Sequence, residues 1–253
     1  MDVIASIHWI IAVMIGAIAG FTGGLFGVSG GTIVVAVLAA DGLDQRLAQG
    51  TSLVVQLPTV LTGLWRYGRQ GTIDGLTGTV LALSSIPAAY VGSRLATHIN
   101  STLLRHGFAI FLLLMASFTV WNALERYRDD RAAARPSRSA ACLLVLMGGF
   151  ASGLFGIGGA AIVTPALVRV FKVKQATAQG LSLAVVLPAV IVGLGTYTRA
   201  GYVDWNIGIP LALGGVMCVA FGVKLAHALP ERFLRFAFAA LLGSVSLFLL
   251  LKP

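Results

Sequence analysis

The residues best suited to bind a ligand form two clusters rich in glycine, each inside an apolar stretch. The first runs from Gly20 to Gly31 and the second from Gly149 to Ala160, 129 residues later. Glycine destabilises a helix interior by roughly 1 kcal/mol relative to alanine, so we expect each cluster to break its helix. A helix that resumes after a break presents free N–H groups and a positive dipole end, and both attract anions.

Two copies of a short polar motif lie downstream of these clusters. Residues 48–53 read Ala-Gln-Gly-Thr-Ser-Leu and residues 178–183 read Ala-Gln-Gly-Leu-Ser-Leu. Threonine and serine are good helix N-caps, so we expect a helix to begin near Ser52 and to present free N–H groups there. Gln49 and Gln179 could donate hydrogen bonds to a ligand, or could satisfy backbone carbonyls freed by the break.

Near the middle of a membrane, such groups would bind an anion without needing a full positive charge. Gln56 adds one further donor in the first copy only, because Val186 stands at the matching position. The candidate anion-binding residues are Gly27, Ser29, Gly30, Gly31, Gln49, Gly50, Thr51 and Ser52 in the first half, and Gly156, Gly158, Gly159, Gln179, Gly180 and Ser182 in the second.

Other residues have simpler explanations. Small residues let helices pack closely, and this is our expectation for the isolated glycines Gly16, Gly63, Gly92, Gly193 and Gly222. Aromatic and basic residues near helix ends anchor at the membrane interface, and this is our expectation for Arg66, Tyr67, Tyr197 and Arg199.

One motif suggests catalysis. Residues 27–31, Gly-Val-Ser-Gly-Gly, fit the G-x-S-x-G pattern of serine hydrolases. That pattern needs a strand–turn–helix setting or a histidine partner, and Gly158 stands where Ser29 would recur. We therefore expect neither an enzyme nor a cofactor, and the two cysteines show no metal-ligand spacing.

The composition indicates a membrane protein. Of the 253 residues, 57% are hydrophobic and 11% charged, with a mean hydropathy of +0.91, whereas soluble proteins have about 25% charged residues. The apolar residues fall in long blocks, as in polytopic α-helical proteins. The net charge of +9 is explained by loops that face anionic lipid, so no nucleic-acid partner is expected. The nine acidic residues lie near block ends or in loops, which suits an anion better than a cation as substrate.

The chain is an internal duplication. Between residues 48–67 and 178–197, 12 of 20 positions are identical, where chance would give about two or three. We expect a first repeat over residues 1–124, a cytoplasmic basic linker over 125–139, which holds five arginines, and a second repeat over 140–253.

Loop charges bear on how the repeats insert. If every apolar block crosses the membrane, the repeats are parallel and the 18 Lys and Arg residues divide 9 to 9, against the positive-inside rule. If each glycine-broken segment is a re-entrant hairpin, the repeats are inverted and the division is 13 to 5. The arms of the first hairpin are about 15 and 10 residues, or about 22 and 15 Å, too short to cross a core of about 30 Å. A single broken crossing is the alternative, because the arms could add end to end.

The predicted fold is therefore an all-α polytopic membrane protein of two inverted repeats. Each repeat is a glycine-broken re-entrant helix hairpin plus three transmembrane helices, and both termini lie on the outer side of the membrane.

These motifs resemble the sulfite exporter TauE/SafE family of membrane transporters. The resemblance covers nearly the whole chain and includes the glycine-rich segment, the Ala-x-Gly-Thr-Ser-Leu-type motif with a proline downstream, and the run Gly-Tyr-Val-Asp-Trp at 201–205. The family's motif falls on Gly27, Gly30, Gly31, Gly50, Thr51, Ser52 and Pro58, and on Gly156, Gly158, Gly159, Pro165, Gly180, Ser182 and Pro188.

The resemblance implies export of a small sulfur-containing anion, such as sulfite, sulfoacetate or a related organosulfonate, across the bacterial inner membrane. We therefore expect a secondary transporter that works by alternating access about a midplane site. The alternatives are an anion channel, or a carrier of another small organic anion such as a carboxylate. The expected partners are the anion and the lipid bilayer, and a homo-oligomer is left open.

Overall fold

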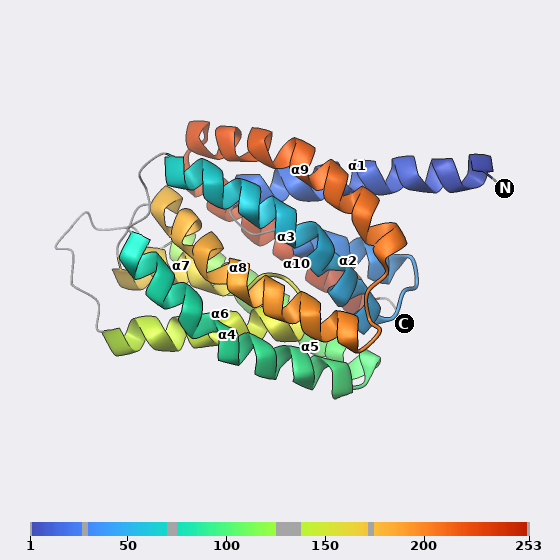
Figure 1. Ribbon diagram of the computed structural model, residues 1–253. Helices are drawn as coiled ribbons and strands as arrows, with labels where there is room; N and C mark the ends of the chain where they lie inside the picture. The colour runs from blue at the N-terminus through green and yellow to red at the C-terminus, as the bar shows by residue number, and fades with distance from the viewer. Residues whose placement is uncertain (1, 27–29, 70–74, 125–137, 172–174, 252–253) are drawn as a thin grey trace.

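The computed structural model describes residues 2–26, 30–69, 75–124, 138–171 and 175–251, and this part of the chain forms ten helices (Figure 1). They are α1 (Asp2–Phe26), α2 (Gly31–Ala40), α3 (Gln45–Arg69), α4 (Gly75–His98), α5 (Ser101–Leu124), α6 (Arg138–Phe155), α7 (Ala160–Phe171), α8 (Gln175–Arg199), α9 (Trp205–Ala228) and α10 (Glu231–Leu251). No strand occurs among the described residues, so the prediction of an all-α protein is confirmed.

Five helices in the described part are long and apolar enough to cross a membrane. The candidate spans are Trp9–Phe26, Ser101–Trp121, Ala178–Arg199, Trp205–Ala226 and Arg232–Leu251. Large apolar side chains are exposed along them, among them Met14, Leu114 and Met217. Long helices with apolar outward faces suit a lipid environment, and together they indicate a multi-pass membrane protein.

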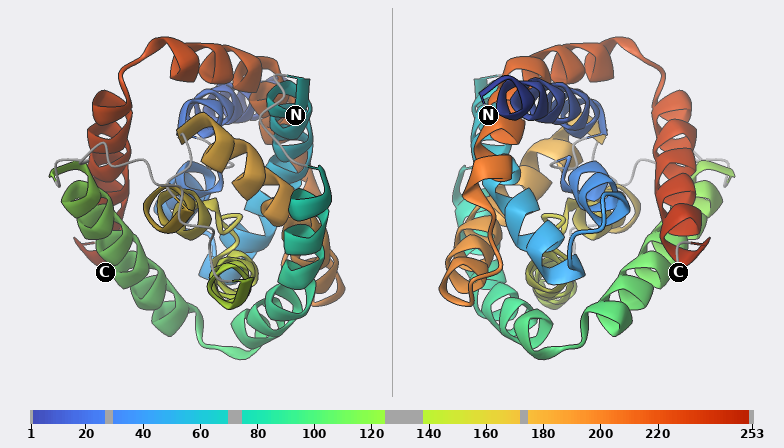
Figure 2. Two further views of the ribbon diagram at one scale, coloured as in Figure 1. Left: turned by 90° about the vertical axis from the view of Figure 1, so that its left-hand side faces the viewer. Right: turned by 90° about the vertical axis from the view of Figure 1, so that its right-hand side faces the viewer.

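The short helices α2 and α7 lie in the interior. In the views along the bundle, α4, α5, α9 and α10 surround them (Figure 2). Most of α2 is buried, including Val34, Val35 and Leu38. Ile157, in the break that precedes α7, has no exposed surface. The interrupted segment that leads into α7 therefore lies inside protein, where a membrane protein tolerates irregular backbone.

Glycines line the two most extensive helix contacts, α1 with α9 and α4 with α6. A Cβ on Gly20 would lie 2.1 Å from the carbonyl oxygen of Gly215, and one on Gly153 would lie 2.1 Å from that of Ala89. The backbones thus touch directly, as small residues allow. A Cβ would also meet a neighbouring helix at Gly16, Gly24, Gly63, Gly92, Gly149, Gly193, Gly214 and Gly222. The packing prediction for the isolated glycines is therefore confirmed.

Both glycine contacts join parallel helices. Gly16 faces Leu211 and Gly24 faces Val219, so α1 and α9 run in the same direction. Gly149 faces Ser85 and Gly153 faces Ala89, so α6 and α4 also run in the same direction. The first helix of each half of the chain therefore packs along a helix of the other half.

Two hydrogen bonds define one end of the bundle, called here the terminal end. The backbone N–H of Gln45 donates to Ser101 Oγ at 2.9 Å, and that of Asp204 donates to Thr51 Oγ1 at 2.9 Å. These bonds bring together the starts of α3, α5 and α9, and the end of α4 lies at the same place because α5 follows it after two residues. Because α1 runs with α9 and α6 runs with α4, α1 starts at the terminal end and α6 at the opposite end. Both chain termini lie at the terminal end (Figure 1).

The helix breaks are shorter than the sequence predicted. Helix α1 continues through Leu25 to Phe26, and α6 continues through Leu154 to Phe155. The early glycines stay helical because they pack against the backbone of the partner helix, which offsets their propensity cost of about 1 kcal/mol each. At 25 residues, α1 is about 37 Å long rather than about 22 Å, so the argument that its arm is too short to cross was wrong.

Candidate functional site

The break of the second half meets the start of α2 inside the bundle. The carbonyl oxygen of Gly156 accepts hydrogen bonds from Ser52 Oγ at 2.7 Å and from Gln56 Nε2. A Cβ on Gly31, the first residue of α2, would lie 3.1 Å from that same carbonyl oxygen and closer still to the Gln56 side chain. Residues of α3 therefore hold the second break against the start of α2.

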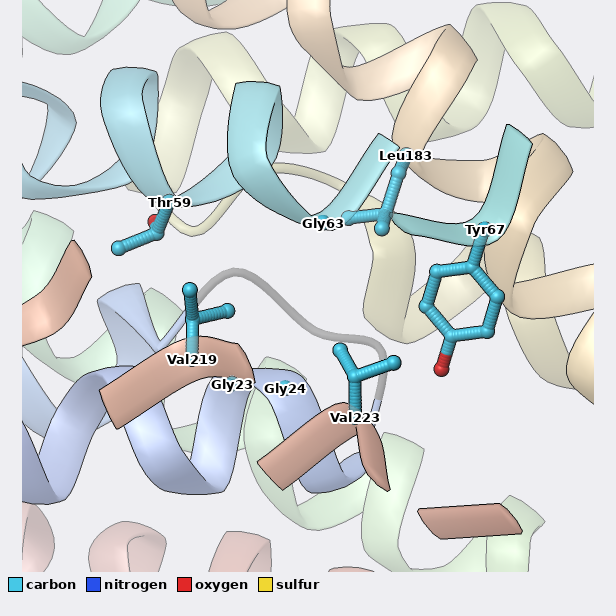
Figure 3. Close-up of a pocket in the computed structure, with 8 residues that line it drawn as sticks. All are labelled: Gly23, Gly24, Thr59, Gly63, Tyr67, Leu183, Val219 and Val223. Atoms are coloured by element: carbon cyan, nitrogen blue, oxygen red, sulfur yellow. The ribbon is translucent and has the colours of Figure 1, made fainter. Parts of the chain in front are cut away.

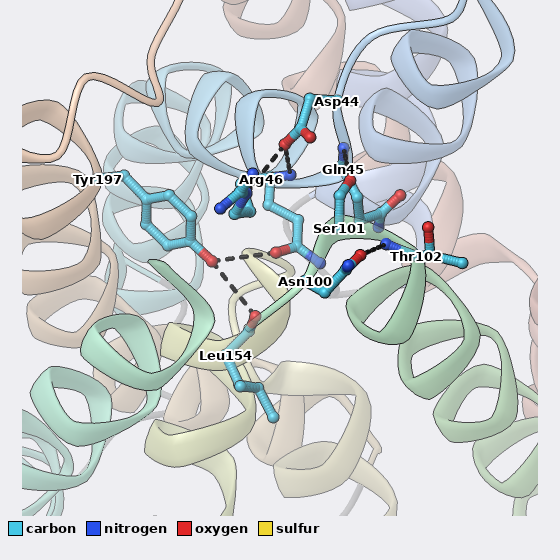
Figure 4. Close-up of polar contacts among 9 residues, drawn as sticks. Asp44, Gln45, Arg46, Asn100, Ser101, Thr102, Leu154 and Tyr197 are labelled. Carbon is cyan, nitrogen blue, oxygen red and sulfur yellow. Dashed lines mark hydrogen bonds and ion pairs between the residues drawn. The ribbon is translucent and has the colours of Figure 1, made fainter. Parts of the chain in front are cut away.

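Each half contributes a buried tyrosine that bonds to a glutamine of the other half. The hydroxyl of Tyr67 donates to Gln179 Oε1 at 2.8 Å, and that of Tyr197 donates to Gln49 Oε1 at 3.0 Å (Figure 4). All four side chains are at most 2% exposed. The prediction that both tyrosines are interfacial anchors was therefore wrong, whereas Arg66 and Arg199 are exposed at helix ends as expected.

The two glutamines each keep one unused donor. Within the described part of the chain, Nε2 of Gln49 and Nε2 of Gln179 are buried and have no hydrogen-bond partner. Leaving a buried donor unpaired costs about 1–3 kcal/mol. Because tyrosine holds the amide oxygen, the amide N–H groups of each glutamine are left to bind something else.

These contacts define two half-sites. The first comprises Gln49, Ser52 and Gln56 of α3 with Gly156 and Tyr197. Ser52 Oγ lies 2.7 Å from the Gln49 carbonyl oxygen as well as from that of Gly156. This half-site thus joins the start of α3 to the break of the second half and to the last turn of α8.

The second half-site comprises Gln179, Ser182, Thr164 and Tyr67. Ser182 Oγ donates to the Gln179 carbonyl at 2.8 Å and accepts from Thr164 Oγ1 at 2.8 Å. Thr164 was missed because the first half offers no polar residue to match it. The two half-sites are similar without being identical.

The structure does not bring Gln49 and Gln179 together. Gln179 bonds to Tyr67, which lies on α3 18 residues after Gln49, or about 27 Å along the helix. The expectation of one site that holds both glutamines was therefore wrong. The half-sites lie toward opposite ends of the bundle, with the meeting point of Gly31 and Gly156 in the interior.

The predicted helix start at Ser52 is also wrong. Helix α3 begins at Gln45 and runs unbroken through residues 49–52, so among the described residues the helices that start beside the breaks are α2 and α7. Gly50 is present because a Cβ there would lie 1.8 Å from the carbonyl oxygen of Tyr202. One glycine costs about 1 kcal/mol, which this close packing offsets.

The remaining candidate residues occupy structural positions or lie outside the description. Thr51 accepts the N–H of Asp204, whose carboxylate caps α9, and Gly180 is buried within α8. Positive φ angles of 62–76° at the breaks require glycine; they occur at Gly30, Gly156, Gly158 and Gly159. Gly27 and Ser29 lie outside the described residues, so the serine of the hydrolase-like motif is not placed.

Free space near the second half-site is small. A cavity of about 10 Å³ beside Tyr67 is lined by Gly24, Gly63 and Leu183 among others (Figure 3). That volume holds about one water molecule. The described helices are therefore closed around this half-site.

The half-sites are neutral and rich in donors. The hydroxyls of Ser52 and Ser182 already donate to backbone carbonyls, so the donors left unused are Nε2 of Gln49 and Nε2 of Gln179. The first-turn N–H groups of α2 and α7 lie beside the breaks, and no carboxylate is among the residues that form the half-sites. Such preorganised dipoles favour a bound anion over a cation.

The comparisons with known proteins agree on one family. The family model described as sulfite exporter TauE/SafE matches residues 12–249. A protein of Methanocaldococcus jannaschii, named as a probable membrane transporter protein, is 30% identical over 94% of both chains. A protein of Bacillus subtilis with the same description is 27% identical over 88% of this chain and 89% of its own. No solved structure matches. The family and these relatives are transporters and not enzymes, and the chain belongs to the sulfite exporter TauE/SafE family of membrane transporters.

Proposed function

We propose that this protein is a secondary transporter that exports a small sulfur-containing anion, such as sulfite, sulfoacetate or a related organosulfonate, by alternating access. The observation that carries the proposal is the unpaired, buried amide donor of Gln49 and of Gln179. Each lies in a half-site that contains no formal charge. An anion that accepts from these donors would remove the cost of leaving them unpaired.

The direction of the helices supports two inverted repeats. Helices α1 and α6 start at opposite ends of the bundle, and each packs along a helix of the other half. We propose that residues 1–124 and 140–253 are these repeats, with 125–139 as a cytoplasmic linker and both termini periplasmic. In this arrangement 13 of the 18 basic residues lie on the cytoplasmic side, as the positive-inside rule favours.

Alternating access needs two matching sets of contacts that exchange. The reciprocal bonds Tyr67–Gln179 and Tyr197–Gln49 supply such a pair. The glycine contacts of α1 with α9 and of α4 with α6 are backbone on backbone, so few side chains need to change rotamer when these helices slide. In this proposal the anion would be held near the middle of the membrane, close to the contact of Gly31 with the carbonyl oxygen of Gly156.

The proposal is tested by exchange of labelled for unlabelled sulfite in proteoliposomes. Gln49→Glu and Gln179→Glu keep the oxygen that accepts from tyrosine but replace the donor N–H groups with a carboxylate oxygen. We expect each variant to raise the half-saturating sulfite concentration about 10- to 100-fold, which corresponds to the loss of a charge-assisted hydrogen bond. Asn206→Asp is the matched control, because this exposed amide lies outside both half-sites.

The alternatives give different results in the same vesicles. A channel would pass net current without exchange stimulated by unlabelled anion on the far side. A carboxylate carrier would exchange acetate better than sulfite, sulfoacetate or taurine. Normal exchange in both glutamate variants, with protein inserted at wild-type levels, would refute the assignment of the half-sites.

A further inference from the structure

A polar cavity lies at the terminal end, separate from both half-sites. Its volume is about 60 Å³, and it is lined by Ala39, Leu43, Gln45, Ser101, Thr102 and Arg105. Gln45 comes from the start of α3, and the last three residues come from the first turns of α5 (Figure 4). The volume exceeds the 10–15 Å³ that one water needs, so the cavity can hold a small ion with water.

Gln45 is the group in this cavity that needs a partner. Its side chain is 2% exposed, and within the described residues neither its amide oxygen nor its amide nitrogen has a hydrogen-bond partner. An amide buried in this way is costly unless something fills the cavity and bonds to it. A suitable ligand accepts a bond from Nε2, and it donates to Oε1 through its own hydroxyl or through an adjacent water.

The charges around the cavity favour an anion. Arg105 lines it directly, and the start of α5 adds the positive end of a 24-residue helix. Asp44 is near, but it forms an ion pair with Arg46 at 3.2 Å. Burial disfavours the charged form of Asp44, yet hydrogen bonds from Arg46 and Ser101 outweigh burial and hold the pKa of Asp44 below its ordinary 3.8. The carboxylate of Asp44 is thus already compensated by Arg46 and Ser101.

Buried polar side chains connect the cavity to the first half-site along one face of α3. Polar side chains at most 4% exposed follow one another at helical spacing on this face, which we call the polar face of α3: Gln45, Gln49, Ser52, Gln56 and Thr59. Gln45 lies one turn from Gln49, about 6 Å along the helix. An anion could therefore pass from the cavity to the half-site without leaving polar contacts.

We propose that the cavity formed by Gln45, Ser101, Thr102 and Arg105 is a second binding site for a small oxyanion. Arg105 and Gln45 Nε2 bind its oxygens, and Gln45 Oε1 accepts from a protonated oxygen of the anion or from a bound water. That this site serves as a vestibule of the transport path rests on the proposed function, whereas binding itself does not.

The sequence at this cavity is only partly repeated in the second half. Gln175 and Arg235 correspond to Gln45 and Arg105, whereas Glu231 and Arg232 stand at the positions of Ser101 and Thr102. The duplicated sequence has therefore diverged at two of the four polar positions.

The test is equilibrium binding of radiolabelled sulfite to the purified full-length protein in detergent. We expect wild-type protein to bind one more equivalent of sulfite per chain than Arg105→Gln or Gln45→Leu. In each of these variants the affinity of the cavity for sulfite should fall about 10- to 100-fold. Leucine fills the cavity with an apolar side chain of similar size, so Gln45→Leu keeps a packed fold. Arg94→Gln removes an exposed arginine of α4, four residues before the end of that helix, and should bind like wild type.

Three results separate this site from the half-sites and from lipid. The double variant Gln49→Glu/Gln179→Glu tests whether the two sites are independent. If it still binds the equivalent of sulfite that depends on Arg105, the cavity binds sulfite independently of the proposed transport site, and the proposal stands. If Arg105→Gln and Gln45→Leu bind as wild type does, the proposal is refuted while the half-sites are unaffected. If added phosphatidylglycerol displaces this equivalent and free sulfate does not, the cavity holds a lipid headgroup phosphate and the proposal is also refuted.

Discussion

Tyr67→Phe is the most direct probe of the interior, because it removes the hydroxyl that bonds to Gln179 and leaves the aromatic ring in place. The hydroxyl has no exposed surface and donates to Gln179 Oε1 at 2.8 Å. Without it, the amide oxygen of Gln179 is left buried and unpaired. We expect the free energy of unfolding to fall by about 1–3 kcal/mol. Tyr90→Phe is the matched control, since Tyr90 is 50% exposed and should change stability by no more than about 0.5 kcal/mol.

A double-mutant cycle shows whether the bond itself is responsible. In a Gln179→Leu background the bond between Tyr67 and Gln179 is absent, so Tyr67→Phe should then destabilise the protein less than it does in the wild-type background. The measurement is unfolding in detergent, followed by tryptophan fluorescence for the four proteins of the cycle. Equal destabilisation by Tyr67→Phe in both backgrounds, or none beyond that of Tyr90→Phe, would refute the reciprocal pairing.

Three further predictions concern the helices. Gly20→Leu should abolish the yield of monodisperse protein, because a Cβ there would lie 2.1 Å from a carbonyl oxygen of α9. Gly243→Ala should purify normally, because a Cβ at that position would meet no neighbouring atom within 4 Å. Asp204→Ala should lower stability by about 0.5–2 kcal/mol, since it removes the cap of α9, and Asp204→Asn should retain most of it in the same unfolding assay. In a background without native cysteines, impermeant maleimide should label cysteine at Arg66 and at Arg199 from opposite sides of the membrane; labelling of both from one side would mean parallel repeats.

The sequence predicted the location of the helix breaks well and their extent poorly. Helices are interrupted at Gly30 and at Gly158 and Gly159, because these residues have positive φ angles. Gly20 belongs to the same glycine-rich cluster, yet it stays helical. Its lack of a Cβ allows the backbone of α1 to contact α9. Glycine lowers helix stability by only about 1 kcal/mol per residue. A contact with a helix distant in the sequence therefore decides whether the helix breaks at a glycine or continues through it.

The tyrosines show a signal that could have been used. Gln49 and Tyr67 are 18 residues apart, which is five turns of helix and therefore the same face, and the same spacing separates Gln179 from Tyr197. If one residue of each pair faces the interior, so must the other. What no periodicity could supply is that each tyrosine bonds to the glutamine of the other half, because that depends on how α3 and α8 pack together.

The exchange of partners between halves constrains how the protein is made. Helix α1 packs along α9, and α9 is synthesised about 180 residues after α1, so the glycine face of α1 stays uncovered until then. Until then that face meets lipid or the insertion machinery, and Gly16, Gly20 and Gly24 weaken the isolated helix. A chain stopped after α5 would lack the contacts that hold α1, and would be expected to be degraded rather than to accumulate as a stable half-protein.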